Sequence, residues 1–353
     1  MRVCRCSLRR LFSFLKLNDI HICRRLSLIY QIFYYNNDDS IDLRIDTVLQ
    51  PLFFITDRLA KYLGRLFICF FLIIMSVVIY IFYTSIFIHL YQAIHHEHNY
   101  LTFLSHIIVS HWLLINIMFN YIQYADYTEL STNTPLNSSN SIINSKINCQ
   151  NVCRKCIFPK PSRAHHCSIC ARCILNQDHH CPWINNCVGH LNHRYFFQFC
   201  FFLTLGSLYA ATLGFTEFQH FLFVDVLPTV TNPSMYYTFL FLFIVAITAG
   251  VVLFGFTLWH FWLVSRAETT IDFHTNSSER KRLKQIKQKF INPYDLGFVL
   301  NWKMFLGLNR WYEILYRNFL PSTHRPFCDG INWPRRKILN SFEEKKTLEI
   351  MNV

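Results

Sequence analysis

Cysteine and histidine are concentrated in one part of the chain, residues 149–187, which holds eight of its 14 cysteines. The full set is Cys149, Cys153, Cys156, His165, His166, Cys167, Cys170, Cys173, His179, His180, Cys181 and Cys187. Two pairs, 153/156 and 167/170, have two residues between their cysteines, a spacing that lets both thiolates reach one ion. Structural zinc takes four such ligands in a tetrahedron. The set therefore predicts two zinc ions, with ligands to spare.

Backbone geometry divides neighbouring ligands between the two ions. Pro159-Lys160-Pro161 prevents a helix, so short strands and turns are expected here. In an extended strand adjacent side chains point to opposite faces. His166 and Cys167 then serve different ions, and His179 and His180 cannot both face one ion. Spacing alone predicts two interleaved sites and at least one histidine-cysteine pair outside them, without saying which pair.

Four apolar runs without Lys, Arg, Asp or Glu flank this region. They cover residues 66–91, 101–125, 195–216 and 235–264. At roughly 1.5 Å per helical residue, each is long enough to cross a hydrocarbon core of ~30 Å. We therefore expect an all-α polytopic membrane protein with four transmembrane helices and a small cytosolic zinc-bound module of short strands and loops.

The basic residues define the expected topology. All 34 Lys and Arg residues fall in residues 1–65, in the loop 126–195 or after residue 264. Lys and Arg beside spans stay cytoplasmic, so both termini and the central loop are expected in the cytosol. Thiols remain reduced there, and close cysteines indicate metal or catalysis. The net charge of +13 suits an anionic membrane surface and requires no nucleic-acid partner.

The expected domain organisation follows from these runs. It comprises a cytosolic N-terminal region 1–65, transmembrane helices 66–91 and 101–125, the cytosolic cysteine-rich zinc domain 149–194, transmembrane helices 195–216 and 235–264, and a cytosolic C-terminal region 265–353. In the last region a basic stretch, Glu279–Lys289, is expected to form a helix with Asn276 or Ser277 as its N-cap.

The motifs of the module resemble those of the DHHC protein S-acyltransferases, the zinc-finger palmitoyltransferases. The resemblance is carried by Cys153-x2-Cys156, His166-Cys167-x2-Cys170-x2-Cys173, Asp178-His179-His180-Cys181-Pro182-Trp183 and Asn186-Cys187-Val188-Gly189. Thr269-Thr270-Ile271-Asp272 resembles the family's TTxE motif, with Asp272 where glutamate is usual. Asn292-Pro293-Tyr294-Asp295-Leu296-Gly297 resembles its C-terminal segment.

This resemblance implies a role for each ligand-type residue. One zinc would take Cys153, Cys156, His166 and Cys173, and the other Cys167, Cys170, His180 and Cys187. Cys181 would stay free as the nucleophile, with His179 as its base and Asp178 orienting His179. A free thiol beside a base can attack a thioester, whereas a zinc with four protein ligands is structural.

The implied function is that of a protein S-palmitoyltransferase. A fatty acyl group would pass from palmitoyl-CoA, through acyl-Cys181, to cysteine thiols of proteins at the cytosolic membrane face. The family resemblance suggests the endoplasmic reticulum or Golgi membrane. Trp183 and Gly206, the latter roughly 16 Å into the third span at 1.5 Å per residue, are expected to contact the acyl chain. Packing of the module for Trp183, and close helix packing for Gly206, are the alternatives.

Two other functions compete with this one. A membrane-anchored RING-type ubiquitin ligase also interleaves two zinc ions. It needs a closing C-x2-C pair, however, which is absent after Cys173, and it gives no reason for Asp178-His179. A non-enzymatic zinc scaffold is the third hypothesis, and such a scaffold would form no thioester on Cys181.

Overall fold

The computed structural model describes residue 59, residues 63–87, residue 91 and residues 100–126, 151–153, 155–156, 158–223 and 233–336. Cys149 and nearly all of the expected N-terminal region lie outside the described residues. The chain divides into two units, Met1–Tyr62 and Leu63–Val353.

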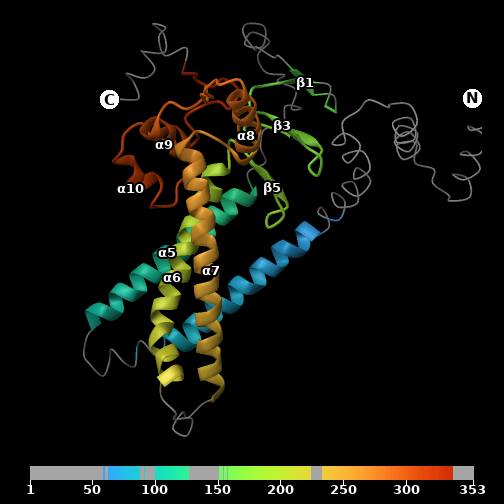
Figure 1. Cartoon of the computed structure of the whole chain (residues 1–353). Coiled ribbons are helices and arrows are strands. Elements are labelled where there is room, and N and C mark those ends of the chain that lie inside the picture. Colours follow the sequence, from blue (N-terminus) through green and yellow to red (C-terminus); the bar gives the residue numbers. More distant parts are fainter. Residues whose placement is uncertain are drawn as a thin grey trace, which may run out of the picture. The chain divides into compact units, whose positions relative to one another are not determined.

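Four helices in the described part of the chain are long and apolar enough to cross a membrane. They are Leu63–Thr84, α5 (Tyr100–Asp126), α6 (His193–Phe223) and α7 (Pro233–Ser265). The first continues into a π-helical turn, η1 (Phe82–Phe87). Helix α6 packs against both α5 and α7, as Figure 1 shows. The prediction of a polytopic helical membrane protein is confirmed.

The cysteine-rich module consists of three antiparallel two-stranded hairpins. Their strands are β1 (Asn151–Cys153) with β2 (Phe158–Lys160), β3 (His165–Cys167) with β4 (Arg172–Ile174), and β5 (His179–Cys181) with β6 (Asn186–Val188). Hairpins this short are not stable alone in water. The expected module of short strands is confirmed, and its stability must come from bound metal and from packing on the helices.

Strand register aligns histidine with cysteine in two of the hairpins. His166 lies opposite Cys173 in the β3–β4 pair, and His180 lies opposite Cys187 in the β5–β6 pair. Side chains directly opposite each other lie on the same face of the sheet. Each pairing therefore brings one imidazole and one thiol to the same face.

The third hairpin is anchored to the helices by an apolar cluster. Cys181 belongs to this cluster, and its other buried members are Tyr121 and Tyr124 of α5, Ile184 and Val188 of the hairpin, and Tyr195, Phe196 and Cys200 of α6. Burial of this much aromatic surface fixes the hairpin against the helix ends. The Cys181 side chain is consequently held where the module meets the spans.

Helix α8 (Thr270–Gln285) begins with a capping box. The Thr269 side chain accepts from the Asp272 N–H, and the Asp272 carboxylate accepts from the Thr269 N–H. The expectation that Asn276 or Ser277 caps this helix is wrong, because Thr269 already does so. Asn276 instead donates to the Glu268 carboxylate at 2.7 Å.

The C-terminal region seals the end of α7. Asn301, in α9 (Phe298–Leu306), donates to the Ser265 carbonyl at 3.0 Å. Asn292 donates to the Arg266 carbonyl at 2.8 Å. The last carbonyls of a helix have no partner within the helix, so these amides replace water at the end of the span. The short helix α10 (Glu313–Arg317) follows.

Arg163 ties the zinc module to α8 and to the C-terminal region. Its guanidinium lies 2.5 Å from the Asp272 carboxylate and donates to the Ala267 carbonyl at 2.9 Å. It also lies 4.5 Å from the ring centroid of Trp333. The Arg163 side chain is 6% exposed, and the charge-assisted contacts are therefore shielded from water.

We predict that Asp272→Ala lowers the free energy of unfolding by at least about 2 kcal/mol, because it removes the carboxylate half of the capping box and leaves the buried Arg163 cation without its acidic partner. Thermal unfolding of the purified chain in detergent micelles measures the change. The control is Glu279→Ala, which breaks the more exposed ion pair with Arg282 and should leave thermal unfolding close to that of the wild type, because water screens exposed pairs. Equal losses in the two variants would contradict the role of Asp272.

Candidate active site and metal centres

Two groups of four ligand-type residues converge in the module. They are Cys153, Cys156, His166 and Cys173, and Cys167, Cys170, His180 and Cys187. Within each group the ligand atoms all lie within 4.8 Å of one another. These are the two sets that the family resemblance implied. Three thiols and one imidazole form a donor set typical of structural zinc.

Distances within the groups fit a tetrahedral ion. The His166 Nδ1 atom lies 3.2, 3.6 and 3.9 Å from the three sulfurs of its group. The His180 Nδ1 atom lies 3.3, 3.7 and 3.8 Å from its three sulfurs. Nitrogen and sulfur on a tetrahedral zinc are about 3.5 Å apart at normal bond lengths. The protein atoms are therefore already arranged for the metal.

The neighbours in β3 and β5 separate as extended strands require. His166 and Cys167 belong to different groups, and His180 joins a group from which His179 is absent. Cys181 also lies outside both zinc-type groups. Cys181 is 5% exposed as a residue and packs in the apolar cluster at the helix ends.

Asp178, His179 and Cys181 form a connected set of polar groups. His179 Nδ1 donates to Asp178 Oδ2 at 2.7 Å. Burial opposes charge on His179, but its hydrogen bonds to Asp178 and Cys181 raise its pKa to about 9. Burial also opposes a Cys181 thiolate, yet the adjacent His179 lowers the pKa of that thiol. The electrostatics therefore favour an imidazolium–thiolate pair, the reactive form of cysteine.

The Asp178 carboxylate, 1% exposed, is supported mainly from α8. The Thr270 N–H donates to Oδ1 at 2.7 Å and the Thr270 hydroxyl donates to Oδ2 at 3.0 Å. The partial positive charge of the helix N-terminus adds to these bonds. Burial opposes ionisation, but the hydrogen bond and positive charge of the His179 ring hold the pKa of Asp178 well below its usual range.

Three residues around Asp178 were not singled out from the sequence. Thr270 lies in the motif resembling TTxE, which gave no indication of its partner. His193 and His260 lie beside Asp178 at the ends of α6 and α7. His260 carried a signal, because an ionisable residue inside an apolar span usually has a function.

A cavity of about 330 Å³ lies among the four spans. Its lining includes Trp183, Gly206, Ser207 and Ala210, although Cys181 is not part of it. The Trp183 ring is 5.0 Å from the ring of Phe67, between centroids. Trp183 thus joins the module to the first span beside an apolar space.

Gly206 faces both the cavity and helix α5. A Cβ atom at Gly206 would lie 3.1 Å from Cδ1 of Ile117. That separation is tighter than ordinary van der Waals contact, so the position also serves close packing of α5 on α6. The two interpretations of Gly206 are compatible.

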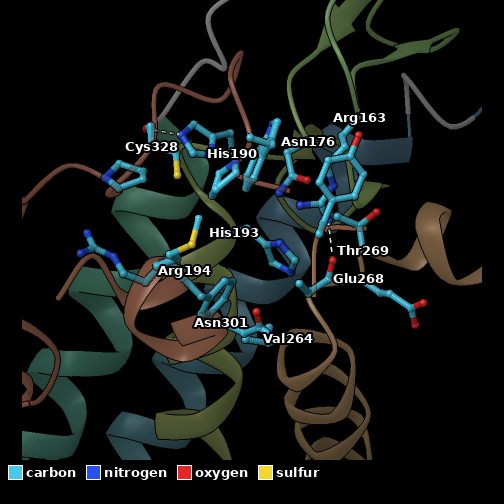
Figure 2. A pocket seen from close by; sticks show the side chains of 17 residues that line it. Arg163, Asn176, His190, His193, Arg194, Val264, Glu268, Thr269, Asn301 and Cys328 are labelled. Atoms are coloured by element: carbon cyan, nitrogen blue, oxygen red, sulfur yellow. Dashed lines mark hydrogen bonds between the residues drawn. The ribbon is translucent and has the colours of Figure 1, made fainter. Parts of the chain in front are cut away.

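A second, smaller pocket of about 70 Å³ lies on the module side of α7, and Figure 2 shows it from close by. Arg163, His190, His193, Glu268 and Cys328 are among its lining residues. His190 donates to the Cys328 carbonyl at 2.8 Å. His193 also lines this pocket, and its Nε2 atom is 3.8 Å from Asp178 Oδ1. The His193 ring therefore lies between the pocket and the Asp178 carboxylate.

Comparison with known proteins agrees with this architecture. Residues 146–277 match the family model of the DHHC palmitoyltransferases. The chain is 32% identical to palmitoyltransferase ZDHHC16A of Danio rerio over 351 residues, which cover 87% of this chain and 88% of that protein. It is 34% identical to palmitoyltransferase ZDHHC16 of Homo sapiens over 325 residues, covering 85% and 82%.

The chain is also 34% identical to palmitoyltransferase ZDHHC15 of Rattus norvegicus over 194 residues, which cover 54% of this chain and 51% of that protein. The chain belongs to the DHHC palmitoyltransferase family. The prediction of a membrane-embedded protein S-palmitoyltransferase is confirmed, and the hypotheses of a ubiquitin ligase and of a non-enzymatic scaffold are set aside.

We predict that Thr270→Val slows self-acylation roughly tenfold, because it removes a hydroxyl bond to a buried carboxylate, worth about 1.5–3 kcal/mol, and keeps the backbone bond. Single-turnover labelling with a fatty acyl-CoA measures the rate, and Thr270→Ser should restore it. Thr275→Val is the matched control, since the Thr275 hydroxyl donates to the Ile271 carbonyl of its own helix and, among the described residues, to no group of the site. A Thr270→Val rate equal to that of the control would refute the contact's importance.

Proposed function

We propose that Cys181 is the nucleophile, that His179 is its general base, and that Asp178 orients His179 and supports its positive charge. The observation that carries this proposal is the series of hydrogen bonds from Thr270 through Asp178 to His179. The series ends at His179, beside the Cys181 thiol. The pKa of that thiol is lowered, and Cys181 lies outside both metal-binding groups. A base held by a buried acid beside a nucleophile is the arrangement of covalent catalysis.

Two structural zinc ions are held by the two groups of three cysteines and one histidine. Each group supplies four protein ligands, so neither ion retains an open coordination position for substrate. Zinc bound there stabilises the hairpins. The ligand Cys187 and the nucleophile Cys181 lie in the two paired strands of one hairpin. The ion bound by Cys187 therefore positions the nucleophile without binding it.

In the first half-reaction the Cys181 thiolate attacks the thioester carbonyl carbon of palmitoyl-CoA. The new carbon–sulfur bond forms on Cys181, the bond to the CoA sulfur breaks, and the CoA thiolate takes the proton from the His179 imidazolium. The products are acyl-Cys181 and CoA-SH. Asp178 keeps the His179 ring in the required tautomer, with Nδ1–H toward the carboxylate.

In the second half-reaction a cysteine of a protein substrate replaces CoA. His179 takes the proton of the incoming thiol, the resulting thiolate attacks the carbonyl of acyl-Cys181, and Cys181 leaves as a thiolate and is reprotonated by His179. Atoms and charge balance in this ping-pong sequence. The substrate cysteine must lie close to the membrane, because Cys181 lies where the module meets the spans.

The acyl chain occupies the cavity among the spans. Its lining is almost wholly apolar, and Trp183 lies only two residues beyond the nucleophile. Trp183 contacts the first methylenes, and Gly206 lies where a longer chain passes α6. Burial of each methylene contributes about 0.8 kcal/mol, so chain length is recognised by how far the cavity extends.

The placement of the basic residues supports a multi-pass protein with both termini in the cytosol. The assignment to the endoplasmic reticulum or Golgi membrane rests on the resemblance to the family alone. In this topology the module 149–194 and the region 265–353 share the cytosolic face with acyl-CoA and with the thiols of substrate proteins. The proposal retains a cytosolic N-terminal region and four transmembrane helices, with the expected bounds 1–65 for the former and 66–91, 101–125, 195–216 and 235–264 for the latter.

We predict that Cys181→Ser abolishes hydroxylamine-sensitive self-acylation while two zinc ions per chain remain. The hydroxyl at this position cannot form a thioester, and the metal ligands are untouched. Labelling with a clickable fatty acid and metal analysis of the purified chain give the two readouts. Cys187→Ala should do the reverse and lose metal together with folded protein. Loss of a zinc ion from Cys181→Ser would show that Cys181 is a ligand and overturn the assignment.

We predict that Gly206→Phe shifts self-acylation toward acyl chains of about fourteen carbons or fewer, because the ring fills part of the cavity and removes space for about 0.8 kcal/mol of burial per lost methylene. Self-acylation with acyl-CoAs of graded length measures the profile. Gly255→Phe is the control, since a Cβ atom at Gly255 would meet nothing within 4 Å. An equal loss at every length would favour helix packing, and an unchanged profile would place the acyl chain elsewhere.

A further inference from the structure

Asp178 lies within a cluster that the acyl-transfer reaction does not fully use. The cluster consists of Asp178, His193 at the start of α6 and His260 near the end of α7, with exposures of 1%, 4% and 2%. One ligand atom from each residue lies within 4.8 Å of the other two. No cysteine belongs to the cluster, which distinguishes it from the two zinc-type groups.

Two imidazole nitrogens in this cluster lack a partner. His193 Nε2 and His260 Nδ1 are both buried without a hydrogen bond among the residues that the structure describes. The 3.8 Å between His193 Nε2 and Asp178 Oδ1 is too long for one. A buried polar atom left unpaired costs about 1–3 kcal/mol. The pair of open nitrogens beside a carboxylate therefore points to a ligand that binds all three.

The walls of the cluster restrict what that ligand is. The ring of Phe196 lies 4.9 Å and that of Phe256 4.7 Å from the His260 ring, while Phe305 lies 5.1 Å from the His193 ring, all between centroids. These side chains offer no hydrogen-bonding group. The occupant must be small, and its bonds must be satisfied by two nitrogens and one carboxylate oxygen.

We propose that Asp178, His193 and His260 form a third metal site, which takes a divalent transition-metal cation such as Zn²⁺. Two imidazoles and a carboxylate are zinc ligands, and three protein ligands leave one coordination position open. Ligand atoms on a tetrahedral zinc lie about 3.3 Å apart at normal bond lengths. The 3.8 Å between His193 Nε2 and Asp178 Oδ1 exceeds that value by about 0.5 Å.

The carboxylate has a free position for the ion. Asp178 Oδ2 accepts hydrogen bonds from the His179 ring and the Thr270 hydroxyl. Among the described residues, Oδ1 accepts a hydrogen bond only from the Thr270 N–H. A carboxylate oxygen has two lone pairs. The cation therefore binds Oδ1 on the side facing His193 and leaves the existing bonds in place.

The test is a metal titration of the full chain, purified in detergent micelles with its two structural zinc ions. Co²⁺ is the probe, since thiolate ligation gives an intense charge-transfer band that nitrogen and oxygen ligands lack. We expect a third equivalent without that band, in both the wild-type chain and Cys181→Ser. His260→Gln and His193→Gln should each weaken its binding at least tenfold. His274→Gln, at an exposed histidine on α8, should bind as the wild type does.

Two results would overturn the site. Absence of a third equivalent means that water alone fills the cluster. Binding that persists undiminished in both His193→Gln and His260→Gln, or that appears only with the thiolate band, contradicts the proposed ligands. A variant that retains its two structural zinc ions is folded, and weakened binding in either folded histidine variant supports the site.

Discussion

A buried negative charge at Asp178 organises the site. A carboxylate removed from water is costly unless it is paired and hydrogen-bonded, and Asp178 is 1% exposed. Thr270 supplies two bonds from α8 and His179 supplies one from β5. Because these donors come from the module and from the region after α7, the carboxylate can be satisfied only when the two are docked. The charge thus couples formation of the site to assembly of the chain.

The zinc module depends on the helices as much as on metal. Its strands are three residues long, and the side chains that enclose Cys181 come largely from α5 and α6. Metal sets the positions of backbone segments within the module, while aromatic packing sets the position of the module against the spans. Arg163 adds a third attachment, through Asp272 and the Ala267 carbonyl. A change in either the metal-binding groups or the aromatic packing would therefore displace the Cys181 thiol.

Much of this could be predicted from local sequence. Alternation in an extended strand separates His166 from Cys167, and the charge-free runs identify the spans, because both effects depend on residues close together in the chain. The contacts of Thr270 with Asp178 and of Arg163 with Asp272 join residues 92 and 109 positions apart. The periodicity of a sequence does not reveal contacts between residues so far apart in the chain. Asp272 stands where the family usually has glutamate, and its contacts, the capping box and the ion pair with Arg163, are visible only in the structure.

The sealed end of α7 sets a fixed height above the hydrocarbon. Asn292 and Asn301 occupy the terminal carbonyls, so the helix can neither fray nor lengthen there without losing those bonds. Through Thr270 and Asp178 this boundary also fixes the level of the Cys181 sulfur. With Cys181 as the proposed nucleophile, an incoming thiol would have to reach that level from its own membrane attachment. The length of the tether, and not the sequence around the thiol, would then decide which cysteines are equivalent substrates.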